Sequence, residues 1–236
     1  MNAVRAYCQP QGRWLLESIA AGLCVEERSQ QPEDVPGFYL WAVDDHVELC
    51  RGADPGVWIT AQELRRRTVQ GSELLRACGV SAAAPPRVLD AMAGWGVDAL
   101  VLAGRGCRVT LVERHPALCV LAQDLARRSG LTRLVGGQGD GYQALCTPGP
   151  YDVVYLDPMF PLRNKGALPG KRMQWLAQLA GADPRPLHDW LQQAVAKAAG
   201  RVVLKRRRTD PPVAAPDWQI AGRTVRYDVY RGRGGP

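Results

Sequence analysis

The sequence has no apolar run long enough to cross a bilayer, and its N-terminus lacks the hydrophobic core of a signal peptide. It has only three histidines, His46, His115 and His188, and their wide separation does not match the spacing of metal ligands. Its seven cysteines are odd in number and never form a C-x-x-C pair, which argues against a disulfide framework and a zinc site. We therefore expect a cytoplasmic protein with free thiols, no metal and no membrane partner.

Composition and charge indicate a globular protein with a polyanionic partner. Hydrophobic residues make up 46% of the chain and charged residues 22%, as in ordinary soluble proteins. A length of 236 residues accommodates one α/β domain with a small appendage. The formal net charge of +7 favours a partner such as a nucleic acid, although many basic proteins bind none.

An apolar strand, a glycine turn and a helix follow one another in the middle of the chain. The strand is Val88-Leu89-Asp90, Gly94 and Gly96 let the backbone turn tightly beside a ligand, and a helical pattern begins at Asp98. The next predicted strand ends at Glu113, about 20 residues beyond the turn, where an acidic residue usually binds ribose hydroxyls. This order predicts a nucleotide-binding sheet and an adenosine-containing ligand, although a buried turn without a ligand has the same local pattern.

Two carboxylates beside the turn favour one adenosine ligand over another. Residues 94–99 match the dinucleotide pattern G-x-G-x-x-G/A, so a dehydrogenase that uses NAD is one alternative. Asp90 and Asp98 flank the turn, however, and they would repel a pyrophosphate but attract an amino group and a sulfonium. We therefore expect S-adenosylmethionine as the cofactor, with Asp90, Gly94, Gly96 and Asp98 among its contacts.

Strands and helices alternate after residue 86, which predicts a parallel sheet with helices on both faces. The expected strands are 88–90, 109–113, 134–135, 151–156 and 201–205, the expected helices are 98–103, 116–129, 142–145 and 189–199, and residues 219–220 and 224–230 predict a terminal hairpin.

Residues 1–80 are expected to form a small α+β appendage on the substrate side, and residues 81–236 the domain that binds the cofactor. The patterns in the appendage predict helices at 14–20 and 62–78, a hairpin of strands 38–43 and 46–50, and a strand near 57–59. The stretch of small residues at 81–86 marks the predicted boundary.

The fourth strand runs directly into Asp157-Pro158-Met159-Phe160-Pro161. Ligands of an open α/β sheet bind beyond the carboxyl ends of its strands, so Asp157 should emerge beside the glycine turn. Pro158 restricts the backbone of Asp157, and Phe160 offers a flat face for a planar group. A carboxylate and an aromatic ring beside a cofactor suit a base with an exocyclic amine, so we expect both to be catalytic. A strand-terminating turn with a core phenylalanine is the alternative.

Several segments together resemble one family of enzymes. Residues 157–160, called the aspartate motif below, are similar to the (D/N)-P-P-(Y/F) motif of amino methyltransferases, with Met159 in place of the second proline. The matching segments are 88–99, 106–109, 113–114, 153–161 with Lys165 after it, 201–206 and 226–230. They resemble the J-type guanine-N2 methyltransferases of bacterial small-subunit (16S) ribosomal RNA, and the match is weak before residue 86.

The resemblance implies a class I, Rossmann-like methyltransferase fold with a doubly wound sheet and a C-terminal antiparallel hairpin. It also implies methyl transfer from S-adenosyl-L-methionine to the exocyclic N2 of a guanine in 16S ribosomal RNA. Asp157 would orient the guanine amine, and the ring of Phe160 would stack on the base. The implied partner is 16S ribosomal RNA or the small ribosomal subunit.

The same resemblance places the cofactor contacts on Val97-Asp98, Glu113-Arg114, Asp140-Gly141 and Asp157. Val97 stands where the family usually has arginine, so a side-chain contact from that position is lost. Asp140-Gly141 replaces two serines, and Asp140 could accept a hydrogen bond from the adenine amino group instead. A glycine-rich stretch before the first strand is shortened to Thr68–Ser72.

Basic residues after the motif and on the fifth strand are candidates for contacts with RNA phosphates. They are Lys165, Lys171, Arg172, Lys205, Arg206, Arg207 and Arg208. Each of them alone is also compatible with an ordinary surface charge. The whole pattern is compatible with two further functions, an amino methyltransferase acting on DNA or protein glutamine, and a non-catalytic ribosome-binding protein that kept the fold.

Overall fold

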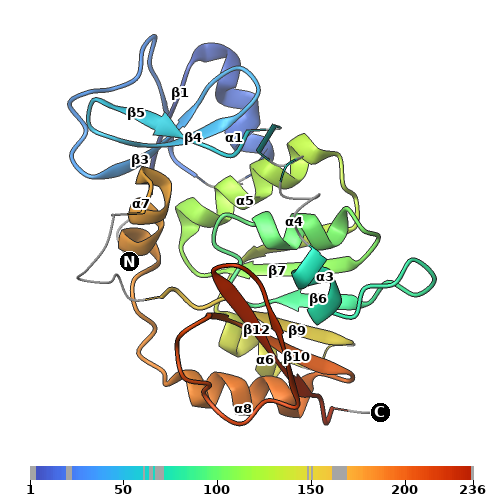
Figure 1. The fold of residues 1–236 in the computed structure, drawn as a ribbon. Coiled ribbons are helices and arrows are strands. Elements are labelled where there is room, and N and C mark those ends of the chain that lie inside the picture. The colour runs from blue at the N-terminus through green and yellow to red at the C-terminus, as the bar shows by residue number, and fades with distance from the viewer. Residues whose placement is uncertain are drawn as a thin grey trace.

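The protein contains two β-sheets, shown in Figure 1 as a computed structural model that describes residues 4–19, 23–60, 62–63, 66, 72–147, 149, 151–160 and 169–234. The larger sheet has seven strands in the order β11-β12-β10-β9-β6-β7-β8. The smaller, N-terminal sheet has five strands in the order β2-β1-β3-β4-β5. The larger sheet carries the glycine turn and the aspartate motif.

Five strands of the larger sheet are parallel, as the alternation of elements predicts. They are β6 (Arg87–Asp90), β7 (Arg108–Glu113), β8 (Leu134–Gln138), β9 (Val153–Leu156) and β10 (Arg201–Arg207). The predicted terminal hairpin is confirmed by β11 (Trp218–Ala221) and β12 (Val225–Arg231), and β12 pairs antiparallel with β10. The chain goes from β6 outward to β8 and then returns to β9 on the other side of β6. This reversal is the switch point at which doubly wound sheets bind ligands.

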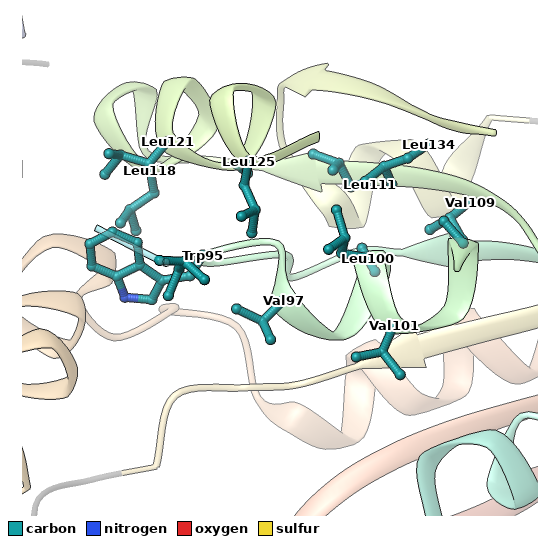
Figure 2. Close-up of a cluster of buried hydrophobic side chains, with 14 of the residues drawn as sticks. Trp95, Val97, Leu100, Val101, Val109, Leu111, Leu118, Leu121, Leu125 and Leu134 are labelled. Atoms are coloured by element: carbon teal, nitrogen blue, oxygen red, sulfur yellow. The ribbon is translucent and has the colours of Figure 1, made fainter. Parts of the chain in front are cut away.

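Successive residues of the parallel strands face two different helical layers. Val153 packs with α3 (Ser72–Ala77), α4 (Val97–Ala103) and α5 (Pro116–Ser129), whereas Val154 packs with α6 (Gly141–Cys146) and α8 (Leu187–Lys197). In Figure 2, Leu100 of α4 lies beside Leu111 of β7 and Leu118 of α5 lies beside Trp95, all within one buried cluster. Because both faces are covered at the centre of the sheet, every residue of β9 is apolar or aromatic and buried.

The N-terminal unit combines parallel and antiparallel strands. Its elements are β1 (Arg5–Cys8), the 3₁₀ helix η1 (Pro10–Gly12), α1 (Arg13–Ile19), β2 (Val25–Glu27), β3 (Phe38–Ala42), β4 (Val47–Arg51) and β5 (Asp54–Val57). The predicted hairpin of β3 and β4 is confirmed. The strand β1 lies between β2 and β3 and pairs in parallel with both, and the sequence patterns predict neither β1 nor β2.

One expected strand is misplaced, one expected helix is only partly described, and one helix was not expected. The strand expected at 57–59 is wrong in position, because β5 ends at Val57. Part of the helix expected at 62–78 lies outside the described residues, and α3, which belongs to it, packs against β11 and β12 of the larger sheet. The helix α7 (Lys171–Ala180) is not predicted at all. The division at residue 80 stays a prediction.

Across the described ranges, we find no helix with the length and apolarity that a membrane crossing requires.

Asp124 of α5 joins the two sheets. Its fully buried carboxylate accepts hydrogen bonds from the backbone N–H of Val47 at 3.2 Å and from Arg128 at 2.8 Å. Arg127 also donates to this carboxylate, at 3.0 Å, and its guanidinium reaches the carbonyl of Asp45 in the β3–β4 turn. A buried charge needs such partners, so the contact gives the N-terminal sheet a defined position on α5.

Replacing Asp124 by alanine should lower the free energy of unfolding by about 3–5 kcal/mol, because two arginines lose their counter-charge and the N–H of Val47 loses its acceptor. Urea unfolding followed by circular dichroism measures the change. The matched control is Asp44→Ala, an exposed aspartate in the same turn, for which we expect a change within about 0.5 kcal/mol. Equal losses in the two variants would contradict the role assigned to Asp124.

Candidate active site

The carboxyl ends of β6, β9 and β10 lie side by side, so their polar side chains meet at the carboxyl-terminal end of the larger sheet. This end of the sheet is called the edge below. The register pairs Asp90 of β6 with Tyr155 of β9, and it places Asp157 and Lys205 directly after paired positions of β9 and β10. The glycine turn that leads into α4 also begins at this edge. The edge coincides with the switch point of the sheet, where a ligand is expected.

Lys205 lies between two carboxylates. Its Nζ donates to Oδ2 of Asp98 at 2.7 Å and to Oδ2 of Asp157 at 2.8 Å. The hydroxyl of Tyr155 donates to the same oxygen of Asp98 at 2.6 Å. The Lys205 side chain is 17% exposed, so these ion pairs are screened less than surface pairs. Burial acts to lower the pKa of Lys205, but Asp157 and Asp98 outweigh it and raise that pKa well above its ordinary value.

Asp90 is a third carboxyl group at this edge, and it is enclosed by the protein. It is 1% exposed, and its Oδ1 accepts a hydrogen bond from the N–H of Met92 at 3.3 Å. Burial, followed by the charges of Asp98 and Asp157, raises the pKa of Asp90 well above its ordinary value. Asp90 therefore keeps its proton far above the pH at which a free aspartate loses it. Its buried position does not fit the predicted contact with a charged ligand group.

The glycine turn is held by a buried glutamate. Gly94 and Gly96 have φ values of +53° and +74°, a backbone conformation that residues other than glycine rarely adopt. Oε2 of Glu113 accepts from the N–H of Gly94 at 2.8 Å, and Oε1 accepts from the N–H of His115 at 2.7 Å. Burial raises the pKa of Glu113, although these two N–H donors oppose that effect. Glu113, which is predicted to bind the ribose, therefore also fixes the backbone of the glycine turn.

Three other predicted cofactor residues contact the protein itself. The side chain of Val97 belongs to the buried core cluster, so little of it is available to a ligand (Figure 2). Gly141 begins α6 so close to the carbonyl of Ala91 that no side chain would fit there. Arg114 donates to Asp183 at 3.0 Å. These contacts explain the three residue types without a ligand.

Asp140 caps α6 and binds Arg185. Its Oδ1 accepts from the N–H of Tyr142 at 2.8 Å, and its two oxygens accept from Arg185 at 2.9 and 2.8 Å. Arg185 also pairs with Asp183 at 2.8 Å, and its guanidinium lies over the rings of Tyr142 and Trp190. The segment before α8 therefore connects Arg114 and Asp140, which the resemblance places at the cofactor.

Phe160 lies at the same edge with one ring face covered by a guanidinium. It is half-buried and belongs to none of the core clusters formed by the described residues, which does not fit the alternative of a core phenylalanine. The Arg207 guanidinium carbon is 5.2 Å from the ring centroid. Arg226 of β12 holds the segment after β10 by donating to the carbonyls of Arg207 and Arg208 at 3.1 and 2.9 Å. The surroundings of Phe160 thus depend on β10 and β12.

The residues predicted to bind RNA do not form one surface cluster. Lys165 lies outside the described residues. Lys171 and Arg172 of α7 donate to the N-terminal unit at 3.0 and 2.9 Å, so both help to attach this helix. Arg206 donates at 3.2 Å to a carbonyl in the segment after its own strand. Lys205 lies between carboxylates, a position that does not fit the predicted phosphate contact.

Comparison with known proteins identifies the family. Residues 53–232 match a family described as "Putative SAM-dependent methyltransferase". The chain is 41% identical to ribosomal RNA small subunit methyltransferase J of Pseudomonas aeruginosa, over 98% of this chain and 93% of that protein. The chain belongs to the methyltransferase J family. A Rhodopseudomonas palustris protein of the same name is 42% identical, over 71% of this chain and 81% of that protein.

A solved structure confirms the fold of this methyltransferase. The crystal structure of a SAM-dependent methyltransferase from Neisseria gonorrhoeae has a TM-score of 0.73 and 29% sequence identity, over 99% of this chain and 98% of that chain. The predicted class I, Rossmann-like architecture with a C-terminal hairpin is therefore confirmed. The protein is an enzyme that uses S-adenosylmethionine.

The charges at the edge of the methyltransferase sheet fit this cofactor. Asp98 and Asp157 face one cation, Lys205, while Asp90 keeps its proton. The cluster therefore has an excess of negative charge, which attracts a sulfonium or an ammonium group and repels a pyrophosphate. The same charges disfavour the dehydrogenase alternative.

Two features of the methyltransferase site are missing from the sequence analysis. Tyr155 is the hydrogen-bond partner of Asp98, and its place two residues before Asp157 was the available signal, because such residues lie on one side of a strand. Lys205 binds Asp157, but it is 48 positions away in the chain and carries no local signal of that pairing.

Replacing Asp90 by asparagine should stabilise the methyltransferase increasingly as the pH rises above about 4. Unfolding lets Asp90 ionise at its ordinary pKa, whereas the folded protein keeps the proton. The unfolded state then binds fewer protons, so the wild type loses up to about 1.4 kcal/mol of stability per pH unit toward the folded-state pKa. Asparagine keeps the acceptor for Met92 and removes this loss.

Melting temperatures of the wild type and Asp90→Asn, measured between about pH 5 and about pH 8, check the expectation. The gap between the two proteins should widen with pH. A constant gap would show that Asp90 is ionised in the folded protein.

Proposed function

We propose that this methyltransferase transfers the methyl group of S-adenosylmethionine to the exocyclic N2 of a guanine in 16S ribosomal RNA. The relatives named ribosomal RNA small subunit methyltransferase J support the RNA substrate. The observation that carries the amine acceptor is the carboxylate of Asp157, bonded to Lys205 at 2.8 Å beside the half-buried ring of Phe160. The substrate is free RNA or RNA in the small subunit.

Asp157 orients the reacting amine. An ionised carboxylate only accepts hydrogen bonds, so it binds one N–H of the guanine amine and directs the nitrogen lone pair toward the cofactor. When bound, S-adenosylmethionine supplies an electrophilic methyl group on its sulfonium. Alignment of this kind contributes up to ~7–11 kcal/mol in favourable cases. The nitrogen becomes acidic only as the N–C bond forms, so its proton passes to Asp157 or to water without a strong base.

Phe160 holds the guanine ring. Arg207 covers one face of the phenylalanine, so the base stacks on the opposite face. The guanine has to leave its own stack to reach this edge, as other base-modifying enzymes require. The carboxylate and the ring together select a planar base that carries an exocyclic amine.

The residues around the glycine turn would hold the cofactor. Asp98 would bind its positive groups, and Gly94 and Gly96 would leave room for it beside the backbone. Glu113 holds the ribose, because each carboxylate oxygen has two acceptor sites and can bind a hydroxyl in addition to the backbone N–H groups.

The N-terminal unit, residues 1–80, and the exposed cations near the edge bind the RNA backbone. Arg208 is exposed directly after β10, and Lys171 is partly exposed where α7 meets the N-terminal unit. The net charge of +7 supports an electrostatic contribution of this kind.

A transfer assay tests the function. Purified protein is incubated with S-adenosylmethionine carrying a labelled methyl group and with 16S ribosomal RNA, free or in small subunits, from a strain that lacks a J-type enzyme. We expect labelled N2-methylguanosine in the nucleosides identified by mass spectrometry. Label incorporated into DNA in a parallel reaction, or into protein glutamine, would support the alternative substrates, and absence of transfer to any guanine would overturn the proposal.

Asp157→Ala should reduce the single-turnover rate of transfer by about 10²-fold or more, because the amine loses its alignment. The affinity for RNA should change little, since the contact matters most during transfer. Rapid-quench kinetics and filter binding measure the two quantities. Lys197→Ala, at the end of α8 by the opposite end of the sheet, serves as the control with a normal rate. Near-normal transfer by Asp157→Ala would place the active site elsewhere.

Phe160→Ala should weaken transfer by the free energy of one base–ring stack, ~1–3 kcal/mol, while leaving cofactor affinity intact. Phe160→Tyr is the matched control and should retain the rate, because it keeps the ring face. Transfer kinetics and calorimetric titration with the cofactor measure the effects. Joint loss of melting temperature and cofactor binding in Phe160→Ala would instead indicate a core residue.

A further inference from the structure

Four side chains form a continuous line of contacts across the reaction centre. Tyr155 donates to Asp98, Lys205 donates to Asp98, and Lys205 also donates to Asp157, at 2.6, 2.7 and 2.8 Å. Asp98 begins the helix beside the glycine turn, and Asp157 begins the aspartate motif. One cation thus connects the cofactor side of the site with the substrate side.

The groups around this cation are acids or neutral hydroxyl and thiol groups. Titratable groups from five neighbouring elements, or from the segments directly after them, interact with Lys205 or its carboxylate partners. They are Asp90 of β6, Cys78 after α3, Asp98 of α4, Tyr155 of β9, Asp157 after β9 and Tyr227 of β12. Among these groups and Lys205, the lysine alone carries a positive charge. The lysine side chain is only 17% exposed, so solvent screens its interaction with the carboxylates weakly.

Resting on the proposed function, we propose that Lys205 is a positioning residue that keeps Asp157 as an oriented carboxylate and couples it to Asp98. Without the cation, Asp98 and Asp157 would repel each other in a partly buried site, and one of them would take up a proton. A protonated Asp157 would direct an O–H donor at the N–H donor of the substrate amine. The lysine therefore maintains the acceptor that the reaction uses.

This role predicts a change in pH dependence that a merely structural residue would not cause. Lys205→Met should move the acidic limb of the single-turnover rate upward by about one to three pH units, since an opposite charge at this distance shifts a carboxyl group by that amount. Lys205→Arg keeps a cation and should show a limb close to that of the wild type. Lys197→Met removes a lysine at the end of α8, by the opposite edge of the sheet, and is the charge control.

A second measurement does not require the cofactor. A carboxyl-carbon NMR titration of the ligand-free protein follows Asp157 directly, and the signal is assigned by its loss in Asp157→Asn. We expect its midpoint to rise in Lys205→Met and to stay unchanged in Lys197→Met. An unchanged midpoint and an unchanged acidic limb in folded Lys205→Met would overturn the proposal.

Loss of the buried cation also has a folding risk, so a charge-balanced pair of variants extends the test. Asp98→Asn is compared with the double variant Asp98→Asn/Lys205→Met, in which one carboxylate and one cation are removed together. The Asp157 midpoint should be higher in the double variant, and equal midpoints would contradict the role of Lys205. If the wild type methylates no guanine, the proposed function fails, whereas the NMR midpoint still decides whether Lys205 controls Asp157.

Discussion

One ammonium group shared by two carboxylates holds the proposed reaction centre together. Asp98 comes from α4, Asp157 from the segment after β9, and Lys205 from β10, so three elements meet at a single cation. Their meeting depends on the register of the parallel strands, because a slip of one residue in β10 would turn Lys205 to the opposite face of the sheet. The helices packed on both faces fix this register, and they therefore also fix the position of Lys205 beside its two carboxylates.

Local patterns predicted the parts of the fold and site that lie close together in the sequence. The glycine turn, the helix at 116–129 and the position of Asp157 at the sheet edge follow from periodicity, glycine placement and strand direction. The position of Lys205 did not follow, because its partners are 107 and 48 positions away. The strands β1 and β2 were also missed, since short strands that pair in parallel have no local turn between them.

The N-terminal unit is attached to the methyltransferase sheet on two sides. Asp124 of α5 binds the N–H of Val47 on one side, and on the other α7 packs the ring of Trp175 against Phe38, with centroids 5.4 Å apart. Because α7 follows the aspartate motif in the chain, the second attachment lies on the substrate side. An inter-domain contact of mixed polar and aromatic character with two anchors restricts hinge motion, so the unit forms part of the framework around the reaction centre.

β12 enters the larger sheet between β10 and β11, although it follows both of them in the chain. Its Arg226 holds the carbonyls of Arg207 and Arg208, and its Tyr227 pairs with Lys205 in the register. Because β12 is inserted there, β10 has a neighbour on each side, with β9 on the other. Without β12, β10 would become an edge strand with unpaired backbone groups, and the carbonyls of Arg207 and Arg208 would lose their donor. The strand that carries Lys205 is therefore held in place by a segment that contributes neither Asp98 nor Asp157.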